Sequence, residues 1–445
     1  MARSITIRDV SIGYEDYRYR TPIKFGGVVL DRVTLLNVRM TVEDAAGKTA
    51  TGIGSTPLGN VWAWPTRALA YDETLAAMQH FAGSVAGLYS GCTVAGHPID
   101  ITHTLEPELL TLGYAHAPSE PMPALAKLVV GSPFDAALHD AYGKLHGLNC
   151  YQTYGPEFVK HDLGYYLGSE FDGERLHNYI STEPKARMPL YHLVGALDPL
   201  TPADVKSPVG DGLPEHLGEW IHRDGLTHLK IKLNGDDLQW DIERVSVVNR
   251  IAETAQQQRG VAQWWYSLDF NERCRDVAYL LDFLQELQAQ TPAGYDRIQY
   301  VEQPTARDLK ANPANKMHEA AKLKPVVIDE SLLDLESLRL AREMGYTGVA
   351  FKACKGQTQT LLLAAAATKF GLFRCVQDLT CVGASLIQSA GIAAHIPGVA
   401  AIESNGRQYC PEANATWDAR FPGIFTIRDG TMNTTILNGP GLGAG

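Results

Sequence analysis

Eight short apolar segments recur between residues 190 and 403, and longer polar or amphipathic stretches separate them. This pattern is typical of parallel strands joined by helices, and such connections are right-handed. The alternative is an open doubly wound sheet, but no glycine-rich phosphate turn follows the first strand. We therefore predict an α/β fold, a TIM-type (β/α) barrel over residues 150–410. The predicted strands are Tyr191–Leu197, Leu229–Leu233, Trp264–Phe270, Ile298–Glu302, Val326–Asp329, Gly348–Lys352, Phe373–Gln377 and Val399–Glu403.

The first 149 residues have a different order, with strands first and helices afterwards. Residues 4–12 and 28–42 alternate as strands do, and spacing typical of helices begins near residue 66. We predict loops at Tyr19–Gly27 and Gly52–Pro65, where proline and glycine gather. Strands followed by helices indicate an α+β domain, which we assign to residues 1–149 as a capping or lid domain. The tail, 411–445, is expected to carry a short strand near 424–427 and to return to the capping domain.

Composition limits the class of protein. A net charge of −11 and a pI near 5.7 argue against nucleic-acid binding. No uninterrupted apolar run approaches the length of a membrane span. The seven cysteines are scattered without a C-x-x-C pair, which favours a reducing cytoplasm over a disulfide framework.

Lys230 and Lys232 lie on one face of the second predicted strand, together with His228. A strand of a parallel barrel is usually apolar, so two inward ammonium groups indicate chemistry. A desolvated lysine loses its proton more readily and can act as a base. The alternative is an edge strand with one solvated face. His228 lies one layer lower, and we interpret it as a satisfied interior residue.

Most of the predicted strands end in a polar or charged residue, and the carboxyl ends of barrel strands surround one mouth. Asp269, Glu302 and Asp329 end three successive strands and are expected to converge there. Their mutual repulsion is relieved by a divalent cation, and an all-oxygen ligand set favours Mg²⁺, with Mn²⁺ as a second choice. The alternative is that the aspartates of Asp269-Phe-Asn and Asp329-Glu-Ser only cap helices.

Lys232 on the second strand and Lys352 on the sixth are expected on opposite sides of the barrel axis. This arrangement suits removal of a proton from a carbon next to a carboxylate, with the metal and a neighbouring cation stabilising the enolate. A lysine whose pKa is depressed by the metal and the other lysine would take the proton.

These residues resemble the enolase superfamily, within it the muconate-lactonising-enzyme-like group of the mandelate racemase family. The matching motifs are Lys230-Ile-Lys232, Asp269-Phe-Asn271, Val301-Glu-Gln-Pro304, Ile328-Asp-Glu-Ser331, Phe351-Lys352 followed by Lys355-Gly, and the helix Pro133–Lys144. The resemblance implies a modified, enolase-like barrel. It implies that Asp269, Glu302 and Asp329 bind Mg²⁺, that Lys232 and Lys352 are the acid/base pair, and that Lys230 helps near the substrate carboxylate. It also makes the two N-terminal loops a lid that selects the substrate.

The chain departs from the family in the gaps between strands two, three and four, which are longer than usual, and in two motifs. The seventh strand ends in Val376-Gln-Asp-Leu-Thr380 without the histidine of the mandelate-racemase-like branch, and Lys352-Ala-Cys-Lys-Gly-Gln lacks a second glycine. The remaining candidates for substrate binding are Lys24, Phe25, Trp62, Trp64, Asn271, Gln377, Asp378, Glu403 and Asn405, with Glu330 supporting the metal ligands. For the residues after strands seven and eight, hydrogen bonds to the lysines or loop caps are an equal alternative.

We therefore expect a cytoplasmic, homo-oligomeric enzyme that acts on a small carboxylate, most simply a racemase or epimerase. A dehydratase or cycloisomerase would use the same residues. A barrel that binds a metal and a ligand without catalysis is a weaker alternative, because binding alone does not need two bases. Metal-dependent hydrolysis needs histidine-rich strand ends, which this sequence lacks.

Overall fold

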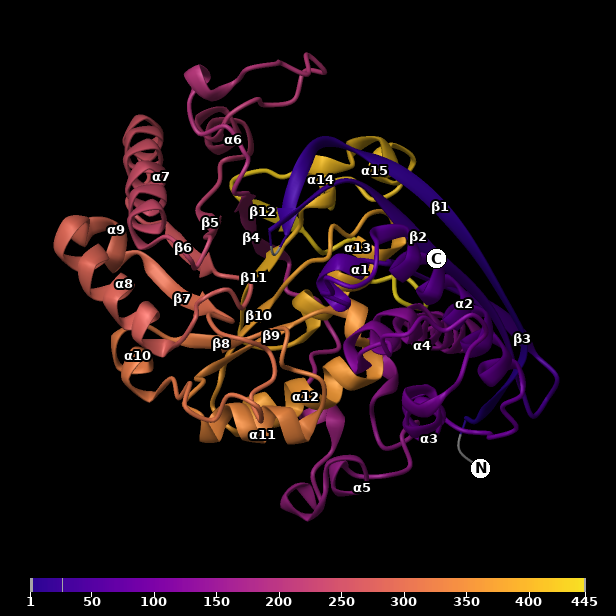
Figure 1. The fold of residues 1–445 in the computed structure, drawn as a ribbon. Helices are drawn as coiled ribbons and strands as arrows, with labels where there is room; N and C mark the ends of the chain where they lie inside the picture. Colours follow the sequence, from indigo (N-terminus) through magenta and orange to yellow (C-terminus); the bar gives the residue numbers. More distant parts are fainter. Residues whose placement is uncertain (1–2, 26, 444–445) are drawn as a thin grey trace.

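The computed structural model describes residues 3–25 and 27–443, and its centre is a closed parallel barrel (Figure 1). Neighbouring strands follow the chain order, and the last strand pairs back to the first through Ile402 opposite Leu190 and Glu403 opposite Tyr191. The predicted barrel is therefore confirmed. Its strands are β4 (Arg187–Val194), β5 (His228–Lys232), β6 (Trp265–Asp269), β7 (Ile298–Glu302), β8 (Val326–Ile328), β9 (Gly348–Phe351), β10 (Phe373–Val376) and β11 (Val399–Glu403).

Helices cover the outside of the barrel, and aspartates begin several of them. Asp237, Asp276 and Asp334 each accept a hydrogen bond from a backbone N–H of the helix that follows. The helices are α6 (Leu217–Asp224), α7 (Leu238–Arg259), α8 (Val277–Gln290), α9 (Pro292–Asp296), α10 (His318–Leu323), α11 (Leu335–Glu343), α12 (Gln357–Lys369), α13 (Ala384–His395), α14 (Gly406–Tyr409) and α15 (Pro411–Asp418). No helix among the described residues has the length and apolar character needed to cross a membrane.

The barrel interior changes from apolar to polar toward the carboxyl ends of the strands. A buried lower layer contains one side chain from each of six strands: Tyr191, Tyr300, Val327, Ala350, Cys375 and Ala401. Inward side chains recur every second residue. The next inward positions, at the ends of β7 and β11 or one residue after β8, β9 and β10, therefore carry Glu302, Asp329, Lys352, Gln377 and Glu403, all of which are buried. The strand period thus places the polar residues in one layer at the mouth.

The N-terminal part consists of an antiparallel sheet and four helices, of which α2 (Tyr71–Ser90) and α4 (Ala124–His146) pack against the sheet. The sheet has the order β1 (Ile5–Phe25), β2 (Val28–Asp44) and β3 (Thr49–Pro57). Gly54 on β3 lies so close to the longest helix that a Cβ there would meet the Pro133 carbonyl oxygen at 1.9 Å. The other two helices are α1 (Asn60–Ala63) and α3 (Pro98–Thr111).

Both loops predicted in this domain are largely regular structure. β1 continues to Phe25, and a register shift between Arg18 and Ile23 accommodates Pro22 inside the strand. The residue before Gly27 lies outside the described residues. The second predicted loop begins as β3 and continues into the short helix α1. Proline and glycine mark real irregularities here, but pairing with β2 keeps Tyr19–Phe25 and Gly52–Pro57 extended.

The tail differs from its prediction in the position of its strand. The strand is β12 (Thr431–Asn433), antiparallel to β4, while 424–427 has no strand. Further on, Gly441 exchanges backbone hydrogen bonds with Leu148 and Cys150, and the Leu442 N–H donates to Asp140 of α4. The tail therefore contacts the end of the α4 helix. The division of the chain at residues 149 and 410 stays a prediction.

Candidate active site

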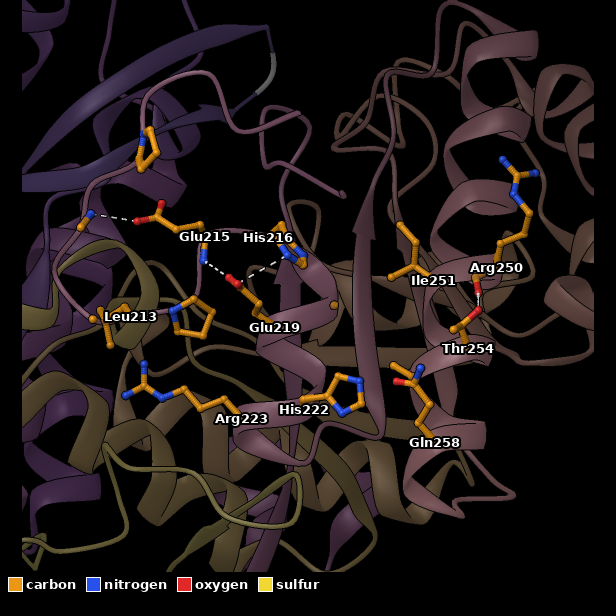
Figure 2. Close-up of a pocket in the computed structure, with 16 residues that line it drawn as sticks. Leu213, Glu215, His216, Glu219, His222, Arg223, Arg250, Ile251, Thr254 and Gln258 are labelled. Carbon is orange, nitrogen blue, oxygen red and sulfur yellow. Dashed lines mark hydrogen bonds and ion pairs between the residues drawn. The ribbon is translucent and has the colours of Figure 1, made fainter. Parts of the chain in front are cut away.

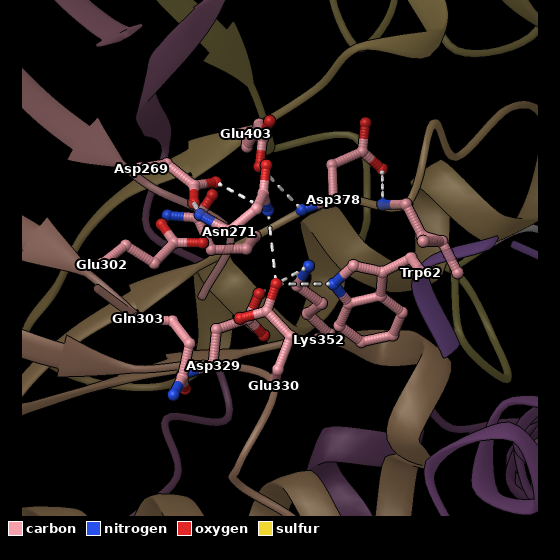
Figure 3. Close-up of polar contacts among 12 residues, drawn as sticks. Trp62, Asp269, Asn271, Glu302, Gln303, Asp329, Glu330, Lys352, Asp378 and Glu403 are labelled. Carbon is pink, nitrogen blue, oxygen red and sulfur yellow. Dashed lines mark hydrogen bonds and ion pairs between the residues drawn. The ribbon is translucent and has the colours of Figure 1, made fainter. Parts of the chain in front are cut away.

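The barrel mouth brings together the lysines and carboxylates that the sequence placed at the strand ends (Figure 3). The strand register sets this arrangement, since Lys232 pairs with Asp269, and Asp269 pairs with Glu302. Asp329 follows β8, the next strand in the barrel. The predicted convergence of three carboxylates from successive strands thus has its basis in the sheet itself.

Lys230 is the most enclosed of the lysines and is 1% exposed. Its ammonium group lies 2.8 Å from Glu302 Oε1, 2.8 Å from Gln377 Oε1, 3.0 Å from Glu403 Oε2 and 3.0 Å from Asp269 Oδ2. Burial lowers the pKa of Lys230, but these carboxylates outweigh burial and raise it well above its ordinary value. Lys230 is therefore a fixed positive charge at the centre of the mouth.

Lys232 and Lys352 lie on opposite sides of this centre, because β5 and β9 are four strands apart in a ring of eight. Lys232 Nζ donates to Asp269 Oδ2 at 2.5 Å and to Asn271 Oδ1 at 2.9 Å. Lys352 Nζ lies 2.9 Å from Asp329 Oδ2. Both lysines are 5% exposed, so each is desolvated and held by one carboxylate.

A fourth lysine, Lys355, lies beside Lys352 at the mouth, and no role was predicted for it from sequence. Lys355 lies in a single 3₁₀ turn after β9, and its ammonium group donates to the Asp329 backbone oxygen at 2.6 Å and to Asp329 Oδ1 at 3.3 Å. It is 4% exposed, and burial lowers its pKa. Its spacing of three residues from Lys352 was the available signal, since one 3₁₀ turn brings such residues to the same side.

The three carboxylates differ in how far the lysines neutralise them. Burial raises the pKa of Asp269, but Lys230 and Lys232 outweigh burial and lower it. Lys352 and Lys355 likewise lower the pKa of Asp329 against burial. The pKa of Glu302 is instead raised well above its ordinary value, by burial and by Asp269. The middle carboxylate therefore carries the least compensated negative charge.

The donor set fits a divalent cation of the magnesium type. Six acids and four lysines are buried at the mouth, so full ionisation leaves an excess of two negative charges. Glu302 Oε2 is buried and has no hydrogen-bond partner among the described residues. Among those residues no three His, Cys, Asp or Glu side chains are grouped as metal ligands, because the acids are turned toward the lysines. Carboxylate oxygens and two uncompensated negative charges suit Mg²⁺. The acids are Asp269, Glu302, Asp329, Glu330, Asp378 and Glu403.

Asp329 raises the pKa of Lys352 above its ordinary value despite burial. This direction is opposite to the depressed pKa that the sequence analysis expected for the base. A divalent cation held by Asp329 would counter the negative charge that raises this pKa.

Two aromatic residues of the N-terminal domain cover the lysines. The Phe25 ring lies 5.5 Å from Lys232 Nζ, and the Trp62 ring lies 4.1 Å from Lys352 Nζ. Above them is a cavity of about 690 Å³, whose lining includes Lys24, Phe25, Trp62, Trp64, Asn271 and Glu330. Lys24 Nζ is 3.4 Å from Asn234 Oδ1. The predicted lid residues therefore line one cavity, which reaches the mouth at Asn271 and Glu330.

The polar residues after β10 and β11 mostly contact one another or the lysines. Gln377 accepts from Lys230, and Glu403 accepts from both Lys230 and the Asn405 amide. The Asp378 carboxylate accepts from the backbone N–H groups of Leu379, Cys381 and Asn405. Burial and Glu403 raise the pKa of Asp378 to about 6. These contacts favour the alternative roles of lysine partner and loop cap.

His228 has the interior role expected of it. Its ring makes an edge contact with Tyr191, with centroids 5.5 Å apart, and its Nδ1 lies 3.0 Å from Thr227 Oγ1. Burial lowers its pKa to about 4.

A wider groove of about 1080 Å³ lies between the segment before α6 and helix α7 (Figure 2). His216 and His222 line it together with Arg223 and Arg250. None of its described lining residues is a predicted site residue or lies at the carboxyl end of a barrel strand. The groove is therefore not the candidate active site.

Comparison with known proteins agrees with this geometry. Residues 213–445, more than half of the chain, match the family model described as enolase C-terminal domain-like. None of the curated proteins matches the sequence.

Solved structures with 15–18% identity share the fold over nearly the whole chain. The L-Ala-D/L-Glu epimerase from Bacillus subtilis has 16% identity and a TM-score of 0.65, covering 98% of this chain and 98% of that chain. Muconate lactonizing enzyme from Pseudomonas fluorescens has 18% identity and a TM-score of 0.64, covering 98% and 96%. A dipeptide epimerase from Enterococcus faecalis, complexed with Mg and L-Leu-L-Tyr, has 15% identity and a TM-score of 0.64, covering 98% and 99%.

Proposed function

Because the chain belongs to the enolase C-terminal domain-like family, we propose that it is a Mg²⁺-dependent enzyme that removes the α-proton of a small carboxylate. The simplest reaction is racemisation or epimerisation. Two of the structural neighbours are epimerases and a third is a lactonizing enzyme, which supports an isomerase or a lyase.

One observation carries the proposal: two desolvated lysines lie on opposite sides of a carboxylate-lined mouth. A carbon placed between Lys232 and Lys352 would have an amine on each face, which inversion of configuration requires. One lysine would take the proton from one face and the other would return a proton to the opposite face. A barrel that only binds a ligand has no need of two such groups.

The other charged residues would hold the substrate and its developing negative charge. Lys230, fixed by its carboxylate partners, would stay positive near the substrate carboxylate. Asp269, Glu302 and Asp329 would hold Mg²⁺, which when bound supplies positive charge to that carboxylate. Glu330 would support these ligands, since it follows Asp329 directly.

The lid residues would bind the remainder of the substrate and exclude water. Phe25 and Trp62 cover the two lysines, and the cavity above them has room for a substrate larger than its reacting carboxylate. Lys24 and Trp64 line this cavity, and we assign them, together with Asn271, to substrate binding.

A lyase, either a dehydratase or a cycloisomerase, is the second candidate. In that reaction one lysine would protonate a leaving group or stay idle. The Trp62 ring lies 4.1 Å from Lys352 Nζ, whereas the Phe25 ring lies 5.5 Å from Lys232 Nζ. Lysines in such unequal surroundings suit a reaction in which they have different roles, as in a lyase.

The test is a screen of carboxylate libraries in D₂O with Mg²⁺, with α-proton exchange followed by NMR. We expect exchange at the α-carbon of one compound class, and product of inverted configuration if the enzyme is a racemase. Exchange accompanied by loss of water or ring closure would identify the lyase. A complete library without exchange, tested with protein that binds Mg²⁺, would contradict the proposal.

A further inference from the structure

We propose that Trp62 is a positioning residue, which links closure of the N-terminal domain over the mouth to the orientation of Lys232. The inference rests on the proposed function for its catalytic consequence, but the hydrogen bonds that carry it are independent of any substrate. Trp62 directly covers Lys352, and the proposal concerns its connection to Lys232 on the opposite side of the mouth.

Two side chains, Glu330 and Asn271, connect Trp62 to Lys232 across the mouth. Figure 3 shows Trp62, Glu330 and Asn271. The Trp62 indole N–H donates to Glu330 Oε1 at 3.0 Å, and the Asn271 amide donates to the same oxygen at 3.2 Å. The Asn271 carbonyl oxygen accepts from Lys232 Nζ at 2.9 Å. We call Trp62, Glu330 and Asn271 the lid bridge. It runs without interruption from the cap to the lysine on the far side of the barrel.

Asn271 is suited to this bridge by its chemistry. An ammonium group only donates and a carboxylate only accepts, so a residue between them must accept on one side and donate on the other. The amide does both, and this requirement fixes which end faces Lys232. Asn271 has a positive φ of 44°, which asparagine tolerates better than most residues, and its backbone N–H donates to Asp269 Oδ1 at 2.8 Å. The backbone and the side chain therefore hold the amide in one orientation.

The barrel also forms a hydrogen bond with the backbone of Trp62. Arg307 Nη1 donates to the Trp62 carbonyl oxygen at 3.0 Å, and the same guanidinium pairs with Glu272, the residue after Asn271. Trp62 is 6% exposed in this arrangement. Two separate contacts thus connect α1 to the segment that follows β6. If α1 moved away from the barrel, Trp62 would lose its hydrogen bonds to Glu330 and Arg307. Glu330 Oε1 would then accept from Asn271 alone of these two donors.

The first test needs no substrate. Backbone amide exchange of the full chain should be followed by mass spectrometry in wild type, Trp62→Phe and Trp64→Phe. Phenylalanine keeps an aromatic ring but loses the five-membered half of the indole together with its N–H, and the same loss of volume occurs in Trp64→Phe. We expect Trp62→Phe to speed exchange at least threefold in both 60–63 and 269–273. Trp64→Phe is the matched control, because the Trp64 indole N–H is buried without a hydrogen-bond partner among the described residues. No change at 269–273, or an equal change in both variants, would overturn the proposal.

The second test uses a substrate from the carboxylate screen. Trp62→Phe should slow α-proton exchange of the stereoisomer served by Lys232 about tenfold, a factor equivalent to losing one hydrogen bond to a charged group. Exchange of the stereoisomer served by Lys352 should change less than threefold. An equal loss for both stereoisomers would show a purely structural role and overturn the inference. If wild type exchanges no compound, the proposed function fails while the amide-exchange test still decides the lid bridge.

Discussion

The two sides of the barrel mouth use the same chemistry with different supports. On one side Lys230 and Lys232, two residues apart on strand β5, share Asp269. On the other, Lys352 and Lys355, three residues apart across a 3₁₀ turn, share Asp329. The flanking aspartates are each neutralised by two lysines, whereas Glu302 between them forms an ion pair with one lysine, Lys230, among the described residues.

This difference indicates which carboxylate most needs a divalent cation. The lysines lower the pKa values of both aspartates, while burial and Asp269 raise that of Glu302. A divalent cation would therefore gain most from Glu302, and the two aspartates would complete its ligand set. The lysines, released from those acids, would then be available to a substrate.

The largest loss of activity should come from Glu302→Gln, which replaces the middle carboxylate by a neutral amide. Turnover should fall about 10²–10³-fold, the scale expected when one stabilising group at a reacting centre is lost. Mg²⁺ affinity, measured by calorimetry, should fall in parallel. Glu286→Gln on the exposed face of α8 is the matched control. A variant that keeps wild-type Mg²⁺ affinity would contradict the role of Glu302.

A smaller and one-sided effect is expected from Lys355→Met. Asp329 would lose one of its two lysines and hold Lys352 more tightly. Exchange of the stereoisomer served by Lys352 should slow about 10–100-fold, as for other residues that orient a metal ligand. The rate for the other stereoisomer should change far less. Equal slowing of both would mean that the two sides are not independent.

The smallest effect concerns stability on the Lys352 side. Glu106 of α3 accepts from Gln359 of α12, the helix that follows Lys352 and Lys355. Burial, followed by Asp135 and Asp334, raises the pKa of Glu106 from 4.5 to about 7. The folded state thus binds this proton more tightly than the unfolded state. The stabilisation is complete below about pH 4.5 and is lost as the pH rises toward 7.

Glu106→Gln should therefore stabilise the protein at pH 8 by roughly 1–3 kcal/mol relative to wild type, and much less at pH 4.5. Thermal unfolding at the two pH values measures the difference. Glu108→Gln, on an exposed position of the same helix, should show no such pH dependence. A gain that is the same at both pH values would contradict the raised pKa of Glu106.

The barrel was predictable from sequence because eight apolar strands recur with helices between them, and the site was predictable because most of those strands end in polar or charged residues. An inward residue recurs every second position, so Lys230 and Lys232, or Tyr300 and Glu302, share a face in any register. Helices and strands near the tail and the lid were harder. Pro22 indicated a loop, yet the pairing of β1 with β2 absorbed it as a register shift.

The convergence of the carboxylates also followed from the order of the strands. The contacts that cross between domains did not. Trp62 reaches Glu330 over 268 residues of sequence, and that contact depends on how α1 lies over the barrel. Lys355 was visible in its motif, but only the 3₁₀ turn directs it to Asp329. Local patterns thus predicted the positions of the groups, and tertiary packing determined their partners.

The central claim is that Lys232 and Lys352 serve opposite faces of one carbon, and stereospecific α-proton exchange in D₂O tests it most directly. With each stereoisomer of a substrate from the screen, Lys352→Ala should stop the exchange of one and leave slow exchange of the other. Lys232→Ala should do the reverse, with losses of about 10²–10⁴-fold for a positioned base. Either change alone should abolish net inversion. Exchange of both stereoisomers at wild-type rates in both variants would contradict the account.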